Sequence, residues 1–186
     1  MVTMMTQASE ALDLAALEAA ASAVPDPELP VVTLGDLGIV RGVAVAGDGA
    51  VEVRLTPTFV GCPATEAIAA DVRAAVEARL RTGGGTGAGG VEVRTRMVMS
   101  PPWSTDWISD DGRRKLAEHG IAPPRAGGHG GPVAVTIGRP PTQQNQACPH
   151  CGSPDTRELS AFGSTPCQSL RACRACGEPF GAMKSL

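Results

Sequence analysis

The hydrophobic residues near the start of the chain recur with the period of an α-helix. Ser9 is a suitable N-cap residue, and the pattern continues to Val24, just before Pro25 stops it. The residues that share one helical face are Leu14, Leu17, Ala21 and Val24. Because this face is apolar, we expect a helix over residues 9–24 that packs against the rest of a domain.

Two segments with the period of a β-strand come next. Residues 39–45 and 51–55 flank a Gly-Asp-Gly turn at 47–49. In the second segment the apolar residues Val51, Val53 and Leu55 alternate with polar ones, which is typical of a half-buried strand. The two segments therefore predict a β-hairpin.

A second helix is predicted after Cys62. Pro63 suits the first helical position, and the apolar residues repeat every fourth position at Ile68, Val72, Val76 and Leu80. A glycine-rich stretch ends this helix, and residues 91–98 form a third predicted strand. The order helix, strand, strand, helix, strand predicts an α+β fold with two helices against a three-stranded sheet.

The second half of the chain divides differently. Ser109 predicts the start of a short helix that ends near His119. Residues 126–145 are rich in Pro, Gly and Gln and predict a flexible linker, with one further strand at 133–137. We therefore predict an α+β domain with its Trp-containing extension over 1–125, and a separate module over 146–186.

That C-terminal module carries two C-x-x-C-G sequences, which we call knuckles. Their cysteines are Cys148, Cys151, Cys173 and Cys176. Four thiolates at this spacing predict a closed, tetrahedral structural site for one zinc ion, and iron is the alternative that accepts the same ligands. The glycine after each second cysteine lets the chain turn around the sulfurs.

Composition excludes several function classes. The net charge is −3 with no long basic run, which argues against binding to nucleic acid. The sequence contains no apolar run long enough to span a bilayer. With six cysteines and no recognisable export signal, we expect metal or thiol chemistry in the cytoplasm rather than disulfides.

Two cysteines outside the knuckles invite a functional interpretation. Cys62 precedes the second predicted helix, whose free N–H groups would lower the pKa of its thiol; the alternative is a small buried apolar residue. Cys167 lies between the knuckles and could replace a ligand, approach the metal site as a spare thiol, or be buried.

The two tryptophans, Trp103 and Trp107, hold most of the aromatic area in their half of the chain. They either fill the edge of the core or form a partner-binding patch, because Trp is enriched at interface hot spots. We find no Ser-His-acid order, phosphate-binding loop or pair of carboxylates that indicates an enzyme.

Several motifs, taken together, resemble a known family. Residues 26–30, 36–40 and 56–63 are similar to the small domain shared by bacterial SufT-like proteins and eukaryotic cytosolic iron–sulfur assembly factors. Residues 102–124 and 162–180 narrow the match, because they resemble the PaaD family (also called PaaJ). Its members are accessory proteins of the multicomponent phenylacetyl-CoA epoxidase.

This resemblance implies a small assembly domain followed by a zinc ribbon, and a non-catalytic role in aerobic phenylacetate breakdown. The implied partners are the oxygenase, which has a diiron site, and its reductase, which carries a flavin and a [2Fe–2S] cluster. In the wider family the cysteine that matches Cys62 is the functional thiol, and the acid that matches Asp36 belongs to a neighbouring motif. We expect Thr58 and Gly61 to support that thiol.

Our leading hypothesis is an assembly factor in which Cys62 is a transient ligand for iron or an iron–sulfur cluster, near Asp36 and Thr58. One thiolate holds a cluster only if other ligands join it, so a homodimer that pairs two Cys62 loops would meet the need.

Two alternatives stay open. The first is a structural or regulatory subunit that docks on the oxygenase through Trp103 and Trp107. The second is a thiol redox protein that uses Cys62 and Cys167, which requires their Cα atoms to lie within about 7 Å.

Overall fold

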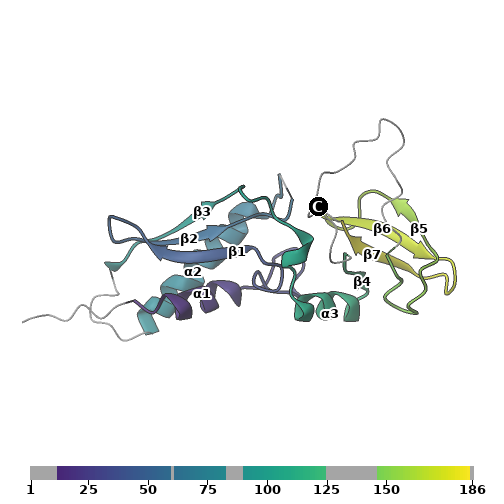
Figure 1. Ribbon diagram of the computed structural model, residues 1–186, viewed down its shortest axis with the longest axis horizontal. Helices are drawn as coiled ribbons and strands as arrows, with labels where there is room; N and C mark the ends of the chain where they lie inside the picture. Colours follow the sequence, from purple (N-terminus) through teal and green to yellow (C-terminus); the bar gives the residue numbers. More distant parts are fainter. Residues whose placement is uncertain (1–11, 60, 83–89, 125–145, 185–186) are drawn as a thin grey trace, which may run out of the picture.

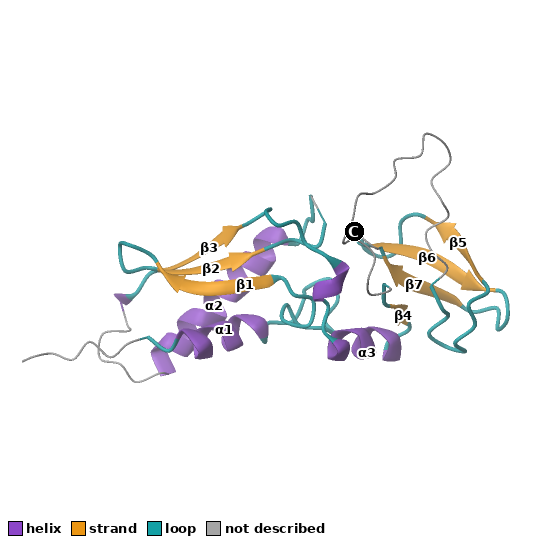
Figure 2. Ribbon diagram, viewed as in Figure 1, coloured by secondary structure: helices purple, strands orange, loops and turns teal. Residues whose placement is uncertain are grey.

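The computed structural model describes residues 12–59, 61–82, 90–124 and 146–184. It shows an elongated molecule, with a three-stranded sheet and two helices at one end and a second sheet at the other (Figures 1 and 2). The predicted linker at 126–145, its strand at 133–137 and the predicted cap Ser9 lie outside the described residues.

The first domain has the predicted order of elements. Its helices are α1 (Leu14–Ser22) and α2 (Thr65–Thr82), and its strands are β1 (Val40–Val45), β2 (Val51–Leu55) and β3 (Val93–Met97). Asp13 is the N-cap of α1, where its side chain accepts a hydrogen bond of 3.0 Å from the N–H of Ala16. The helix therefore begins later than residue 9, the start that the sequence predicted.

The three strands form one sheet in the order β1-β2-β3. The strands β1 and β2 are the predicted antiparallel hairpin, whereas β3 runs parallel to β2. Parallel neighbours need a crossover connection, and α2 supplies it. Both helices lie on the same side of the sheet (Figure 1).

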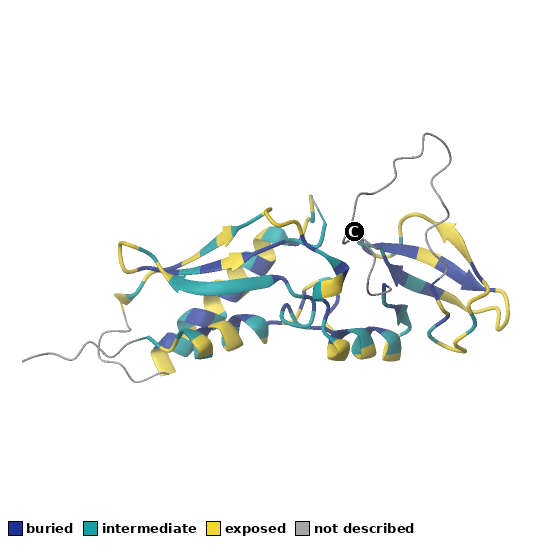
Figure 3. Cartoon of the chain, viewed as in Figure 1, coloured by how far each residue is buried: buried dark blue, intermediate teal, exposed yellow. Residues whose placement is uncertain are grey.

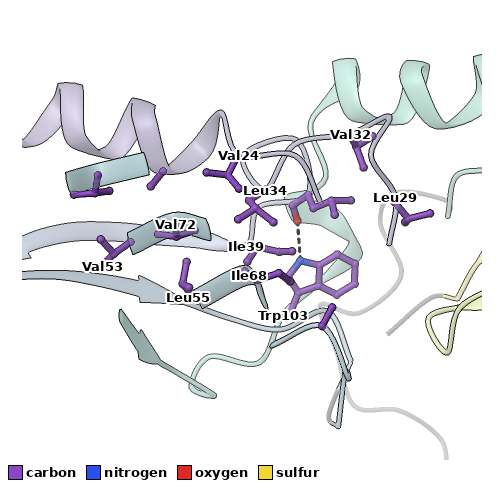
Figure 4. Close-up of a cluster of buried hydrophobic side chains, with 14 of the residues drawn as sticks. Val24, Leu29, Val32, Leu34, Ile39, Val53, Leu55, Ile68, Val72 and Trp103 are labelled. Carbon is purple, nitrogen blue, oxygen red and sulfur yellow. Dashed lines mark hydrogen bonds between the residues drawn. The ribbon is translucent and has the colours of Figure 1, made fainter. Parts of the chain in front are cut away.

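The core lies between this sheet and its helices (Figures 3 and 4). All predicted apolar positions of β2 and α2 are buried there, namely Val51, Val53, Leu55, Ile68, Val72, Val76 and Leu80. The loop between α1 and β1 adds further buried residues that no periodic pattern had indicated: Leu29, Val32, Leu34 and Leu37. This loop extends the core toward the other end of the molecule (Figure 4).

A short segment of two helices and one strand connects the two ends of the molecule. It consists of η2 (Thr105–Trp107), α3 (Asp110–Glu118) and the strand β4 (Ile121–Ala122). Ser109 is the N-cap of α3, as predicted, and its hydroxyl accepts a 2.9 Å hydrogen bond from the N–H of Gly112.

The second sheet has the order β4-β7-β6-β5. It contains β5 (Thr156–Ser160), β6 (Gln168–Cys173) and β7 (Pro179–Met183), and β4 pairs in parallel with β7. One strand of this sheet thus comes from the segment that the sequence assigned to the first domain. The C-terminal module is therefore in direct contact with the rest of the chain through backbone pairing.

The helices in the described part of the chain are too short or too polar to cross a membrane.

Candidate functional site

The four knuckle cysteines meet at one end of the second sheet. Their Sγ atoms all lie within 4.8 Å of one another. Cys148 and Cys176 are 3.8 Å apart at sulfur, and Cys151 and Cys173 are 3.5 Å apart. A tetrahedron with metal–sulfur bonds of about 2.3 Å has edges of about 3.8 Å. The four thiols therefore fit a single metal ion of the structural type.

The glycines of the two knuckles explain why the chain can turn so tightly there. Gly152 has φ +73° and Gly177 has φ +82°, which is the left-handed region that a residue with a Cβ rarely adopts. Each glycine N–H donates to the carbonyl of the first cysteine of its knuckle. The backbone N–H groups of Cys176 and Ala175 lower the pKa of the Cys173 thiol to about 6, whereas burial and the neighbouring thiols raise the pKa of Cys151 and of Cys176.

Cys167 lies outside this four-thiol cluster. Its Sγ is 3.1 Å from the hydroxyl of Thr165, and burial raises the pKa of its thiol. Of the three interpretations left open by the sequence, replacement of a knuckle ligand does not fit this geometry. Cys167 instead faces the first domain and lines a small cavity with Cys62.

Cys62 sits in the loop that precedes α2. Gly61 has φ +88° and turns the chain there, and the Cys62 carbonyl accepts hydrogen bonds from the N–H and the hydroxyl of Thr65, the first residue of α2. Cys62 is half-buried. The Cys62 carbonyl thus accepts two hydrogen bonds from the first residue of α2.

Of the two interpretations of Cys62 that the sequence left open, the lowered pKa is wrong. Burial raises the pKa of its thiol, and the carboxylates of Glu28 and Asp26 raise it further, because a second negative charge nearby is unfavourable. The N–H of Ala64 acts in the opposite direction but is outweighed. The surroundings of Cys62 therefore favour the protonated thiol over the thiolate.

The cavity beside Cys62 has a volume of about 20 Å³. It is lined by Asp26, Glu28, Leu29, Leu37, Ile39, Pro57, Thr58, Cys62, Ile68, Cys167 and Met183. Of the residues predicted to support Cys62, Thr58 lies at the cavity and Asp36 does not. The sequence had paired Cys167 with Cys62 only in the redox alternative. It missed Met183 because this residue comes from the C-terminal module, and Glu28 because it lay within a motif that was noted only for its family resemblance.

Asp36 instead joins two parts of the fold through hydrogen bonds and an ion pair. Its Oδ2 accepts hydrogen bonds of 2.9 Å from the N–H of Thr33 and 2.8 Å from the ammonium of Lys115 in α3. Burial alone would raise the pKa of Asp36, but these hydrogen bonds and the charge of Lys115 outweigh burial and lower it. Asp36 thereby fastens the loop of the first domain to α3.

The two tryptophans take different positions. Trp103 is 6% exposed, and its indole N–H donates a 2.8 Å hydrogen bond to the carbonyl of Leu37 (Figure 4). Trp107 is half-buried, and the Arg41 guanidinium stacks 3.6 Å from its ring centre. Trp103 thus lies in the core, and Trp107 packs at the edge of the core with its ring stacked on Arg41.

Both tryptophans also border an apolar groove of about 580 Å³. The groove is lined by Thr56, Pro57, Thr58, Phe59, Met99, Pro101, Pro102, Trp103, Ser104 and Trp107. Pro57 and Thr58 line the Cys62 cavity as well, so the groove and the cavity share one loop.

Comparison with known proteins finds similarity in both parts of the chain. Residues 14–88 match the family model described as iron-sulfur cluster assembly protein, and residues 134–184 match the one described as PaaD zinc beta ribbon domain. A protein of Escherichia coli K12, provisionally named as a subunit of 1,2-phenylacetyl-CoA epoxidase, is 40% identical over 165 residues, or 89% of this chain and 88% of that protein.

Two further similarities cover part of the chain. An Fe-S protein maturation auxiliary factor from Porphyromonas gingivalis W83 is 37% identical over 93 residues, or 50% of this chain and 80% of that protein. The crystal structure of a domain of unknown function from Bacillus anthracis is 29% identical, with a TM-score of 0.47, and the match covers 55% of this chain and 90% of that one.

Proposed function

The chain belongs to the PaaD family, and from this membership we propose that it is a non-catalytic accessory factor of a phenylacetyl-CoA epoxidase. Its task is to assist the assembly of iron or iron–sulfur centres in the oxygenase or its reductase. The match of residues 14–88 to an iron-sulfur cluster assembly family supports this assignment. The name of the Porphyromonas relative, a maturation factor, agrees with it.

The observation that supports the proposal most directly is the position of Cys62. The half-buried thiol of Cys62 lines a cavity at the contact between the assembly domain and the ribbon, with Thr58 beside it. A cysteine thiolate is the ligand type that iron–sulfur species prefer. In this proposal Cys62 is the residue that contacts the cargo.

The ribbon has a separate task. Cys148, Cys151, Cys173 and Cys176 would hold one zinc ion, whose contribution is to stabilise the fold, because all four positions of a tetrahedral site are taken by the protein. The folded ribbon then keeps β7 and the turn before β6 in place against the first domain. Its metal is structural, and the cargo binds elsewhere.

Client metallation tests the proposal directly. The epoxidase components would be co-expressed with the wild-type chain, with a Cys62→Ser variant, or with neither, and their iron and acid-labile sulfide measured after purification. We expect the diiron subunit or the [2Fe–2S] reductase to be underfilled in the last two cases, and the defective client identifies the cargo. Fully metallated clients with Cys62→Ser would refute the role of this thiol.

A second candidate function is docking of the chain on the oxygenase as a structural or regulatory subunit. The observation that favours it is the apolar groove, in which Met99 is 51% exposed. Met99→Asp and Trp107→Ala should then abolish a stoichiometric complex in pull-down, whereas Cys62→Ser should leave it intact. Trp103→Ala is a poor test, because the buried indole also stabilises the fold.

A further inference from the structure

The apolar groove beside the tryptophans has no charged residue in its lining. Met99, Pro101 and Pro102 are exposed there. Apolar surface of this kind is unfavourable in water, and a contiguous exposed patch of it marks an interaction site. With a volume of about 580 Å³, the groove therefore fits an apolar segment of another molecule.

Two cations lie beside aromatic rings of this lining. The Arg41 guanidinium is 3.6 Å from the ring centre of Trp107, and the Lys184 ammonium is 5.9 Å from that of Phe59. Both rings line the groove, whereas neither cation does. The groove is thus apolar inside and has a positive charge beside two of its aromatic walls.

Neither cation is neutralised by a carboxylate of the described residues. The Lys184 ammonium donates a 2.7 Å hydrogen bond to the carbonyl of Pro166, which carries no net charge. A third cation, the exposed Arg54, is close by in the sheet. Its Nη2 lies 3.1 Å from the position that a Cβ of Gly42 would take, and Gly42 follows Arg41 in β1.

Other arginines of the same sheet do have acidic partners. Arg94 lies 2.6 Å from a carboxylate oxygen of Asp48 and 2.6 Å from one of Glu92. Arg96 lies 3.9 Å from Glu52. The arginines without a carboxylate are therefore the exception in this sheet, and one of them stacks on a wall of the groove. Such charges favour acidic partners and disfavour basic ones, because the potentials of two binding surfaces are complementary.

The groove also reaches the surroundings of the functional thiol. Pro57 and Thr58 line both the groove and the cavity beside Cys62. A segment bound in the groove would contact the loop that leads to Cys62. Docking there would therefore bring the protein that carries the segment close to this thiol.

We propose that the groove binds an apolar segment of a client protein that also carries acidic residues, which pair with Arg41 and Lys184. That the client is a component of the epoxidase rests on the proposed function, whereas the chemistry of the segment rests on the groove and its cations. A second copy of this chain is a poorer occupant, because each copy has a net charge of −3 and two copies repel each other.

Peptides from the epoxidase components test the chemistry of the occupant. Overlapping labelled peptides that span the oxygenase and reductase sequences would be titrated with the full-length, zinc-loaded chain, and binding followed by fluorescence anisotropy. We expect the bound peptides to combine aliphatic or aromatic residues with Asp or Glu, and to bind more weakly as the ionic strength rises. Replacement of these acids by their amides should weaken binding by at least about 5-fold.

Charge-reversal variants locate the binding surface. Arg41→Glu and Lys184→Glu should each weaken binding by more than about 5-fold, and Arg41→Gln and Lys184→Gln should weaken it less. Arg73→Glu, on the exposed side of α2, changes the net charge equally and should bind as the wild type does. Unchanged zinc content and thermal unfolding would show that each variant keeps its fold.

The intrinsic fluorescence of the chain reports on the same groove. The chain has two Trp residues and no Tyr, and both Trp103 and Trp107 border the groove. A bound peptide without Trp or Tyr should therefore shift this emission. Bound peptides that leave it unchanged would show that they bind elsewhere.

Three further results would overturn the inference: no bound peptide, bound peptides without acidic residues, or equal binding by the wild type and both charge-reversal variants. A concentration-dependent dimer in light scattering that Met99→Asp disrupts would assign the groove to a second copy instead.

The outcome is separable from that of the proposed function. Acidic peptides that bind the groove while clients of Cys62→Ser are fully metallated leave the docking site intact and refute the function. Underfilled clients together with no bound peptide refute the docking site and leave the function.

Discussion

Met183, at the end of the last strand, lines the same cavity as Cys62 in the first domain. Met183 also belongs to the buried core cluster of that domain, although its strand β7 is part of the C-terminal sheet. Its carbonyl accepts a 2.6 Å hydrogen bond from the side chain of Gln146, at the start of the C-terminal module. The strand β7 therefore links the C-terminal module, which contains the four-thiol cluster, to the cavity that Cys62 lines.

Truncation of Met183 should destabilise both parts of the chain. Met183→Ala removes a fully buried side chain, which costs about 2–5 kcal/mol in well-packed cores. We expect a lower urea midpoint in unfolding followed by circular dichroism. Met99→Ala is the matched control, because Met99 is 51% exposed and its truncation should change the midpoint little. Equal effects of the two variants would contradict the docking of β7 on the first domain.

Loss of one knuckle ligand should unfold the C-terminal sheet. Cys173→Ser leaves three thiolates, and in such modules metal binding and folding are one equilibrium. The first domain should stay folded but melt at a lower temperature, because it loses the contact with Met183. Bound zinc and a two-step thermal melt measure this.

Cys167→Ser is the matched control for that experiment, since Cys167 is a cysteine of the same module outside the four-thiol cluster. It should retain one zinc per chain. Loss of zinc in both variants would show that Cys167 takes part in the structural site.

The ion pair of Asp36 and Lys115 predicts how stability depends on pH. The pKa of Asp36 is lowered in the folded chain, so its ionised form contributes stability above the ordinary value of 3.8. That contribution is lost as the pH falls through the lowered pKa. Asp36→Asn should therefore be less stable than the wild type at pH 7, with the difference shrinking in acid.

Urea unfolding of both proteins between neutral and acid pH checks this dependence. Asp71→Asn, on the exposed side of α2, is the control and should follow the wild type at each pH. The comparison between variants also removes the effect of acid on the metal knuckles, because that effect is common to all three proteins. A constant difference between wild type and Asp36→Asn would show that the ion pair does not stabilise the fold.

The indole of Trp103 should contribute through its hydrogen bond as well as its bulk. Trp103→Phe removes the donor to the buried carbonyl of Leu37, which we expect to cost about 1–3 kcal/mol in unfolding free energy. Trp107→Phe removes no comparable hydrogen bond and should cost less. Denaturant unfolding of the two variants distinguishes them, and a larger loss at Trp107 would contradict the assignment of Trp103 to the core.

The sequence by itself determined the local parts of this protein. The period of Ile68, Val72, Val76 and Leu80 predicted α2, and the turn at 47–49 predicted the hairpin of β1 and β2. Each signal lies within one element, because a helical face or a tight turn is made by residues close together in the chain. The C-x-x-C-G spacing indicated each knuckle for the same reason, and the four-thiol cluster was predicted because two knuckles together supply the four ligands of one tetrahedral site.

Only the tertiary structure showed that Cys62 and Cys167 line the same cavity. Cys62 and Cys167 meet because β4 pairs with β7 and seats the second sheet on the first domain. A two-residue strand has no periodic pattern, so the sequence could not reveal this pairing. The pKa of Cys62 was mispredicted for a related reason, since burial and the distant carboxylates of Asp26 and Glu28 outweigh the local helix start.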